Sequence, residues 1–209
     1  MSPAQSLLSG AAQLGVTLSE PEAARLLQLL EELGRWNRTY NLTAITEPGE
    51  MMTHHLLDSL AIQADLRGDT VADVGTGAGF PGLPLALVNP QRRFTLIDSN
   101  GKKVRFVSHA ARLLQLTNVE PLQARVESAK GTFDTVIARA FAALPDLLPA
   151  VAGLCDANTR VLAMKGKWPT QELERLPAGW QVEFSRRIEV PGLGEERCAI
   201  ALRRRTGAA

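Results

Sequence analysis

The first 65 residues carry hydrophobic positions at helical spacing. Ser19 and Glu22 have the spacing of a capping box, with a proline between them in the first turn. Three leucines then fall on one stripe of the helix that this box opens, namely Leu26, Leu30 and Leu33. A second helix is predicted over residues 50–61, and its apolar face consists of Met52, Leu56 and Leu60. This part of the chain is therefore expected to be helical.

From Thr70 onward, short apolar runs alternate with helical segments. Strands are predicted at Thr70–Val74, Arg93–Asp98, Val119–Ala124, Phe133–Ala138, Arg160–Met164, Val182–Val190 and Arg197–Leu202. Helices are predicted around Leu83–Val88, Lys102–Leu116, Ala142–Leu154 and Thr170–Leu176. This alternation is typical of an α/β protein with a parallel, doubly wound sheet. The last two strands are joined by too short a turn for a crossover, so they are expected to pair antiparallel.

The run from Asp73 to Gly79 directly follows the first predicted strand. Its three glycines at every second position allow a tight turn whose backbone amides can approach a ligand closely. The dinucleotide fingerprint needs a glycine where this chain has Phe80. A carboxylate two residues before the first glycine suits a ligand with an ammonium or sulfonium group better than one with a pyrophosphate. The run resembles motif I of the S-adenosylmethionine-dependent methyltransferases, although such a turn is also found in ordinary loops.

Three further positions follow predicted strands, where ligands bind in open α/β sheets. Asp98 is placed to accept hydrogen bonds from ribose hydroxyls, or alternatively to cap the next helix. Val126 and Glu127 follow the third strand, where this fold frames an adenine. Arg139 follows an apolar strand, where a cation must either pair or face a cleft. A salt bridge to Asp134 or Asp146 is the alternative for it.

Composition and length indicate one ordinary globular unit. The chain has 209 residues, of which 45% are hydrophobic and 22% are charged. We expect a helical cap over residues 1–65 and a Rossmann-like domain over residues 66–209, within one compact unit. Residues 1–65 contain 3 basic and 8 acidic side chains, whereas residues 66–209 contain 20 and 14. The second part is moderately basic, which permits an RNA partner without requiring one.

The chain shows no signal peptide and no apolar run long enough to span a membrane, so a cytoplasmic protein is expected. Its two cysteines form neither a disulfide framework nor a zinc motif. His54 and His55 are adjacent and point to different faces of a helix, so no metal site is expected there. No long apolar surface stripe requires a dimer, and a monomer is expected.

Several motifs together carry a more specific resemblance. They are Trp36–Thr43, His55–Ser59, Asp73–Gly82, Asp98–Lys103, Arg139–Phe141, Lys165–Gly166 and Val190–Arg197. In order and spacing they resemble the 16S ribosomal RNA guanine-N7 methyltransferase G family, also called glucose-inhibited division protein B. The resemblance extends from about residue 7 to residue 202. The basic tail at residues 203–205 is not a mark of that family.

This resemblance implies a Rossmann-like methyltransferase sheet with an antiparallel C-terminal hairpin and S-adenosylmethionine as cofactor, which leaves as S-adenosylhomocysteine. It implies methylation of N7 of one guanine in 16S ribosomal RNA, within the small ribosomal subunit. It places cofactor contacts at Gly75, Phe80, Val126, Glu127 and Arg139. The physical arguments above add three more cofactor positions, which are Asp73, Gly77 and Asp98.

Two motifs that other methyl acceptors require are missing. Methylation of an exocyclic amine usually uses an Asn/Asp-Pro-Pro-aromatic turn after the fourth strand, and here that turn is Ala138–Phe141. Methylation of C5 of a pyrimidine needs a cysteine nucleophile, and neither Cys155 nor Cys198 is suitably placed. Guanine N7 needs neither device, because its lone pair carries no proton. The absences are consistent with N7 chemistry.

An RNA surface is expected near the cofactor. Lys102, Arg105, His109 and Arg112 fall on one helical stripe that could face outward, or alternatively form an ordinary solvated face. Tyr40 could stack on an unpaired base, or alternatively belong to the core. His55 and Asp58 form either a polar link between helix and sheet or an RNA contact. The full set of RNA candidates is Asn37, Tyr40, His55, Asp58, Lys102, Lys103, Arg105, Lys165 and Arg197.

We expect Arg139 to act as the catalytic residue between cofactor and target base, with Asn37, Tyr40, His55 and Asp58 at the entrance. Three alternatives stay open at this point. A methyltransferase of the same fold could act on another RNA or a small molecule. A non-catalytic cofactor-binding protein of ribosome assembly would bind cofactor without methylating RNA. A nicotinamide oxidoreductase would prefer NAD.

Overall fold

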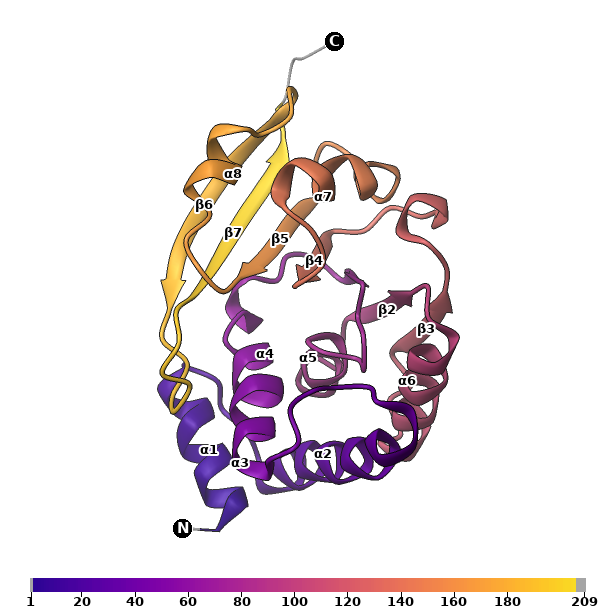
Figure 1. Ribbon diagram of the computed structural model, residues 1–209, viewed down its shortest axis with the longest axis vertical. Helices are drawn as coiled ribbons and strands as arrows, with labels where there is room; N and C mark the ends of the chain where they lie inside the picture. The colour runs from indigo at the N-terminus through magenta and orange to yellow at the C-terminus, as the bar shows by residue number, and fades with distance from the viewer. Residues whose placement is uncertain (1, 206–209) are drawn as a thin grey trace.

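The computed structural model describes residues 2–205 and contains a seven-stranded sheet in the order β3-β2-β1-β4-β5-β7-β6 (Figure 1). The strands are β1 (Thr70–Val74), β2 (Arg93–Asp98), β3 (Val119–Gln123), β4 (Thr135–Arg139), β5 (Arg160–Lys165), β6 (Trp180–Ile188) and β7 (Arg197–Arg204). Strands β1 to β5 pair in parallel, whereas β7 pairs antiparallel with both β5 and β6. The predicted parallel sheet with an antiparallel C-terminal hairpin is confirmed.

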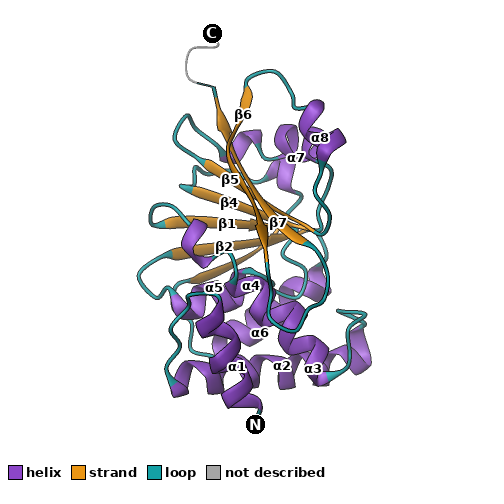
Figure 2. Ribbon diagram, turned by 90° about the vertical axis from the view of Figure 1, so that its left-hand side faces the viewer, coloured by secondary structure: helices purple, strands orange, loops and turns teal. Residues whose placement is uncertain are grey.

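Helices cover both faces of this sheet (Figure 2). The α-helices are α1 (Pro3–Gln13), α2 (Glu20–Tyr40), α3 (Pro48–Met51), α4 (Asp58–Leu60), α5 (Gly82–Val88), α6 (Gly101–Leu113), α7 (Leu144–Ala150) and α8 (Thr170–Glu174). The predicted capping box of α2 is present, since Ser19 and Glu22 exchange hydrogen bonds with each other's backbone. Helices α7 and α8 lie on one face, and the N-terminal helices pack with α5 and α6 on the other.

The two-residue period of the strands decides which side chains meet which helices. In β1, Ala72 and Val74 join the core beneath α7, whereas Val71 belongs to the core shared with the N-terminal helices. Asp73 therefore points to the face of the N-terminal helices. The same alternation along β4 directs Arg139 to that face, because Val136 and Ala138 belong to the α7 core.

The helix predicted over residues 50–61 is only partly correct. Residues 48–60 are continuously helical, but Met52–Leu57 form a π-helical segment between α3 and α4. A π-turn contains more residues than an α-turn, so the simple stripe of every fourth residue does not hold here. Leu56 and Leu60 are buried as predicted, and the segment also buries His55 and Asp58. The burial of His55 and Asp58 places polar side chains in contact with the sheet.

The N-terminal helices and the sheet share one hydrophobic core. The leucine stripe of α2 (Leu26, Leu30 and Leu33) is buried together with Leu96 of β2 and Ile137 of β4. Packing of this kind fixes helix and strand positions relative to each other. Across residues 2–205, none of the helices has the length and apolar character that a membrane crossing demands.

Candidate active site

The glycine-rich turn after β1 is held from beneath by Asp73. Its Oδ2 accepts hydrogen bonds from Thr76 Oγ1 at 2.6 Å and from the Gly82 amide at 2.9 Å. Oδ1 is buried and has no hydrogen-bond partner among residues 2–205. Burial raises the pKa of Asp73 to about 6, although the bonds from Thr76 and Gly82 act in the opposite direction. Asp73 is thus a buried acidic side chain beneath the turn, and it lines neither of the two pockets described next.

Asp98 links the end of β2 to the same turn. Its Oδ2 accepts from the Gly77 amide at 3.0 Å, and Oδ1 accepts from the Asn100 amide at 2.8 Å. The cap of α6 is Asn100, whose side chain accepts from the Lys102 amide, so the alternative of Asp98 as the helix cap is wrong. Each Asp98 oxygen keeps a lone pair that can accept from a ligand hydroxyl.

A pocket of about 200 Å³ opens beside Asp98, and we call it the turn pocket. Its lining consists of Gly75, Ile97, Asp98, Ser99, Ala124, Arg125, Val126, Glu127 and Phe141. Four of the predicted cofactor residues, Gly75, Asp98, Val126 and Glu127, therefore meet in one place. Gly77 and Phe80 belong to the same turn but lie outside this lining.

Gly75 and Phe141 form the tightest contact of this pocket. A Cβ on Gly75 would lie 2.4 Å from Cδ2 of Phe141, and Gly75 has a φ of +66°. Only glycine meets both conditions without strain. Ala140, which precedes Phe141, also has a positive φ of 50°, a conformation in which an alanine is strained. Ala140 therefore places a strained residue directly after the end of β4.

Arg139 lines a second pocket, of about 350 Å³, which we call the arginine pocket. Its Nη1 donates to the His54 carbonyl at 2.8 Å and to Asp58 Oδ2 at 3.0 Å. Neither Asp134 nor Asp146 pairs with Arg139, so the alternative salt bridge is wrong. Asp134 instead accepts from Asp69 and Thr70, on the far end of the sheet.

Asp58 connects the N-terminal helices to two strands. Besides Arg139 of β4, it pairs with Arg197 of β7, whose Nε lies 3.2 Å from Asp58 Oδ1. The Asp58 side chain is only 4% exposed, and the two arginine side chains are 21% and 17% exposed. The predicted polar link between helix and sheet is confirmed.

His55 lies beside this pair as a neutral side chain. Its ring stacks on Phe80 with centroids 4.7 Å apart, and its Nε2 lies 3.2 Å from Thr43 Oγ1. Burial, followed by the positive charges of Arg139 and His54, lowers the pKa of His55 to about 4. Phe80 is itself buried against this ring. His55 thus joins the glycine-rich turn to the segment that contains Thr43.

Asn37 fixes that segment. Its side-chain amide donates to the Thr43 carbonyl, and its oxygen accepts from the Thr43 amide, both at 2.9 Å. The segment contributes Ile45 to the lining of the arginine pocket. Asn37 therefore holds the backbone of the segment that lines this pocket.

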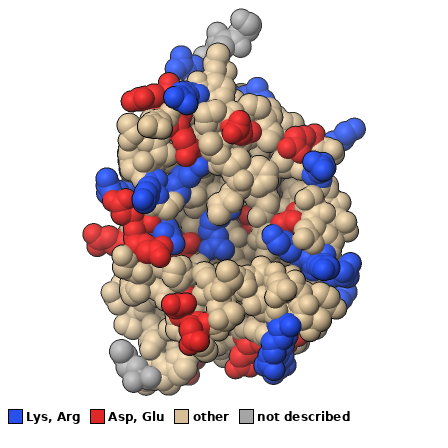
Figure 3. Space-filling model, viewed as in Figure 1, with Lys and Arg blue, Asp and Glu red and all other residues tan. Residues whose placement is uncertain are grey.

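The two pockets adjoin at the end of β4. Arg139 and Ala140 line the arginine pocket, whereas the next residue, Phe141, lines the turn pocket. Figure 3 shows a hollow near the centre of this face with basic side chains inside it. Carboxyl ends of parallel strands are where ligands bind in such sheets. The arrangement offers one compartment for a cofactor and a neighbouring compartment for a second ligand.

The remaining RNA candidates lie around this hollow or apart from it. Lys165 and Arg197 line the arginine pocket, and Lys165 Nζ contacts Glu172 Oε2 at 2.8 Å and the Ala142 carbonyl at 2.7 Å. Lys102 and Arg105 are exposed on α6, and Lys103 is half-buried there. Tyr40 is 39% exposed and touches Trp36, so its placement in the core is wrong.

His109 departs from the predicted outward stripe of α6. Its Nε2 lies 2.8 Å from Glu32 Oε1 of α2, and its ring packs on Trp36 with centroids 5.0 Å apart. Helix α2 covers this side of α6, which the sequence pattern of α6 alone does not reveal. The stripe is therefore exposed only at Lys102, Arg105 and Arg112.

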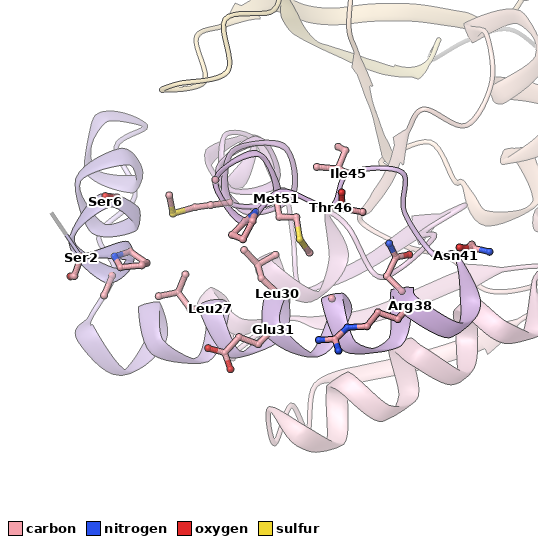
Figure 4. A pocket seen from close by; sticks show the side chains of 17 residues that line it. Ser2, Ser6, Leu27, Leu30, Glu31, Arg38, Asn41, Ile45, Thr46 and Met51 are labelled. Carbon is pink, nitrogen blue, oxygen red and sulfur yellow. The ribbon is translucent and has the colours of Figure 1, made fainter.

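A larger pocket, of about 960 Å³, lies elsewhere, among the N-terminal helices (Figure 4). Every residue that lines it falls between Ser2 and Met52, and Leu27, Leu30 and Met51 supply much of its apolar wall. It contains neither the glycine-rich turn nor a strand end. Its size alone does not connect it with the chemistry at the sheet.

Sequence reasoning missed several residues of the site. Phe141 and Thr43 had no assigned role, although both lie in segments that carry the family resemblance. Ile45 and Glu172 lie outside those segments. No local pattern reveals the pairing of Glu172, because Glu172 belongs to α8 and its partner Lys165 ends β5.

The fold is the Rossmann-like sheet of the S-adenosylmethionine-dependent methyltransferases. Solved structures support the fold. A SAM-dependent methyltransferase from Aquifex aeolicus matches with a TM-score of 0.55 and 22% identity, over 75% of this chain and 93% of that chain. TrmN from Thermus thermophilus matches with a TM-score of 0.59 and 20% identity, over 74% of this chain and 53% of that chain.

Sequence comparison gives the family. The model of rRNA small subunit methyltransferase G matches residues 22–201. A ribosomal RNA small subunit methyltransferase G from Methylococcus capsulatus is 50% identical over 90% of this chain and 92% of its own length. The protein of that name from Ectopseudomonas mendocina is 45% identical over 96% of both chains. The chain belongs to the rRNA small subunit methyltransferase G family, and the predicted resemblance is confirmed.

Proposed function

We propose that this protein transfers a methyl group from S-adenosylmethionine to N7 of one guanine in 16S ribosomal RNA. The observation that carries the proposal is the adjoining pair of pockets at the ends of β1, β2 and β4, in a member of this family. One pocket has the features of an adenosine site, and the other has arginine donors for a nucleotide. The substrate is a small ribosomal subunit or its RNA, and the enzyme acts as a cytoplasmic monomer.

The turn pocket fits the cofactor. Asp98 oxygens are placed to accept from ribose hydroxyls, and Val126 and Glu127 frame the position of the adenine. The Gly75 backbone approaches the ligand without a side chain in the way. Asp73 supplies a negative charge from beneath the turn for the cationic end of the ligand. Bound S-adenosylmethionine supplies an electrophilic methyl group on a positively charged sulfur.

The methyl transfer requires little from the protein beyond the positioning of the two ligands. The guanine N7 lone pair forms the new carbon–nitrogen bond, the methyl–sulfur bond breaks with its electron pair left on sulfur, and the positive charge passes to the purine ring. No proton is removed at N7, so no general base is needed. Orientation of the two ligands is then the main contribution of the protein.

The cysteines agree with this chemistry. Burial raises the pKa of Cys155 to about 12, and burial also raises the pKa of Cys198. Both thiols are therefore protonated at neutral pH and are poor nucleophiles. A covalent mechanism through either cysteine is unsupported by their surroundings.

The test uses labelled S-adenosylmethionine and small ribosomal subunits that lack the modification. The recovered 16S RNA is cleaved chemically at N7-methylguanine, and one new cleavage site is expected. Cofactor binding without label in any RNA would contradict the substrate assignment. Label transferred equally well to a free nucleoside would point to a small-molecule methyltransferase.

Arg139→Ala tests the catalytic role in the same assay. We expect the rate of methyl transfer to fall at least a hundredfold, since a charged donor to the base or cofactor contributes about 3 kcal/mol. The folded state is checked by circular dichroism, and Arg35→Ala on the exposed side of α2, outside both pockets, serves as the control for loss of a surface arginine. An unchanged turnover number would remove Arg139 from the mechanism.

A further inference from the structure

Arg139 is anchored through only one of its three nitrogens. The two hydrogens of Nη1 go to the His54 carbonyl and to Asp58 Oδ2. None of the hydrogen bonds within residues 2–205 uses Nε or Nη2 of Arg139. A guanidinium carries five N–H donors in a rigid fork, so three donors stay available on the pocket side.

Asp58 holds the guanidinium in that orientation. It is almost fully buried, and its second oxygen lies 3.2 Å from Arg197 Nε in an ion pair that forms no hydrogen bond among the described residues. Arg197 is in turn held by Glu195 Oε2 at 3.0 Å and by the Glu196 carbonyl at 2.8 Å. A buried carboxylate between two arginines leaves Arg139 little freedom to rotate.

The free donors face a pocket with room for a base. The arginine pocket has a volume of about 350 Å³, within the range of ligand pockets. Two other basic groups of this pocket are paired or neutral, because Lys165 contacts Glu172 and His55 is uncharged at neutral pH. Among residues 2–205, Arg139 keeps three unused donors, and Arg197, whose Nη1 is held by Glu195 and the Glu196 carbonyl, keeps an unused Nη2.

These donors match one edge of guanine. Along that edge guanine presents two acceptors, O6 and N7, whereas adenine presents N7 and an amino donor. N7 must stay free for methylation, so O6 is the acceptor left for recognition. We propose that Asp58 is a positioning residue that aims the free donors of Arg139 at O6 of the target base, and that this contact selects guanine over adenine. This inference rests on the proposed function.

Charge supports the same assignment. The purine ring gains a positive charge during the reaction, and a lone guanidinium beside it would oppose that change. Asp58 offsets the charge of Arg139 at 3.0 Å. The pair thus offers a hydrogen-bond donor with a reduced net charge.

The test replaces the target guanine by analogues that both keep N7. Inosine keeps O6, whereas 2-aminopurine lacks it, and each is built into 16S RNA by splinted ligation before reconstitution of the subunit. With the unchanged protein we expect transfer to inosine to exceed transfer to 2-aminopurine by about 10- to 100-fold, the usual value of one hydrogen bond to a charged donor. Equal rates on the two analogues would overturn the proposal.

Asp58→Asn tests the positioning role. It keeps the volume but places an amide NH₂ against Nη1 of Arg139 or Nε of Arg197, so we expect the inosine preference to fall to within about threefold. The matched control is Asp65→Asn, which removes a buried carboxylate from the ion pair with Arg186 at 2.7 Å, outside the arginine pocket. A purely structural role of Asp58 would lower both rates equally and leave their ratio unchanged, and that result would refute the inference.

A second variant tests the same contact in case Asp58→Asn folds poorly. Arg139→Lys keeps the charge but lacks the fork, and it is expected to lose the preference while the folded state, checked by circular dichroism, is retained. Retained preference in Arg139→Lys would contradict the assignment of the O6 contact. Failure of the proposed function looks different, because the unchanged protein would then leave a natural guanine unmethylated.

Discussion

Asp73→Asn should make the protein more stable and a poorer binder of its cofactor. The Asp73 carboxylate is completely buried, with Oδ1 unpartnered among the described residues. An asparagine can present its oxygen to Thr76 and Gly82 and place its NH₂ where Oδ1 lies. The hydrogen bonds are then kept and the buried charge is removed, although the buried NH₂ group has no partner where Oδ1 lies and offsets part of the gain.

The magnitude follows from the pKa of Asp73, which burial raises from 3.8 to about 6. Between these pH values the folded state holds a proton that the unfolded state has released. The free energy of unfolding therefore falls as pH rises through this window, and the loss is complete at pH 7. The pKa difference corresponds to about 3 kcal/mol. Asp73→Asn should recover up to that amount at pH 7 and little at pH 4.

The assay is urea unfolding of both proteins, without cofactor, at several pH values from 4.5 to 7.5. We expect the stability difference between variant and parent to grow with pH up to about 6.5 and then level off. Asp134→Asn is the control of opposite sign, because hydrogen bonds from Thr70 lower the pKa of Asp134. That variant should be less stable than the parent, and the difference should stay constant between pH 5 and 7. The pH range in which this stabilisation is lost lies below the ordinary pKa of Asp134.

Cofactor binding supplies the second half of the test. Loss of the charge beneath the turn should weaken S-adenosylmethionine binding by about tenfold or more, or about 1.4 kcal/mol. In the parent protein the affinity should fall as pH drops below about 6, and the variant should lack this dependence. An Asp73→Asn protein that is destabilised equally at pH 5 and pH 7 would show that the buried charge is not costly, and the reasoning would fail.

Two further substitutions test the turn and the entrance. Gly75→Ala should weaken cofactor binding at least tenfold in calorimetry, because it adds about 1 kcal/mol of backbone strain and collides with Phe141. Gly34→Ala, in helix α2 with no atom within 4 Å of the added Cβ, should leave binding unchanged, and equal losses in both would contradict this explanation. Asn37→Ala should lower the free energy of unfolding by about 1–2 kcal/mol in urea, since it removes two hydrogen bonds to Thr43. An unchanged unfolding midpoint would show that Thr43 is held by other contacts.

The strands could be read from the sequence because each is a short apolar run that ends at a polar residue. Strands β1 and β2 were predicted with their observed bounds, and the antiparallel hairpin followed from a turn too short for a crossover. The π-helical segment Met52–Leu57 was not predictable in this way, because it packs against α1 and α2, which no pattern within the segment reveals. Hydrophobic periodicity describes one helix or strand at a time and does not reveal how that element packs against others.

The glycine-rich turn and Asp98 could be predicted because both lie within a few residues of a strand end. The partner of Arg139 could not, since Asp58 is 81 residues away and joins it only through the fold. The sequence offered the nearer carboxylates Asp134 and Asp146, but in the fold neither of them pairs with Arg139. Likewise, His109 contacts Glu32 of α2, whereas the sequence pattern of α6 alone suggested that His109 faces solvent.

Three unfavourable features lie together at one edge of the sheet. A buried carboxylate with a raised pKa, an alanine at positive φ and an arginine with unused donors all lie at the ends of β1 and β4. At the opposite end, Asp134 accepts three hydrogen bonds and its pKa is lowered. Both ends belong to the same strands, so the difference does not come from sheet formation. Bound ligands would relieve the features at the first edge, which is why we place both cofactor and base there.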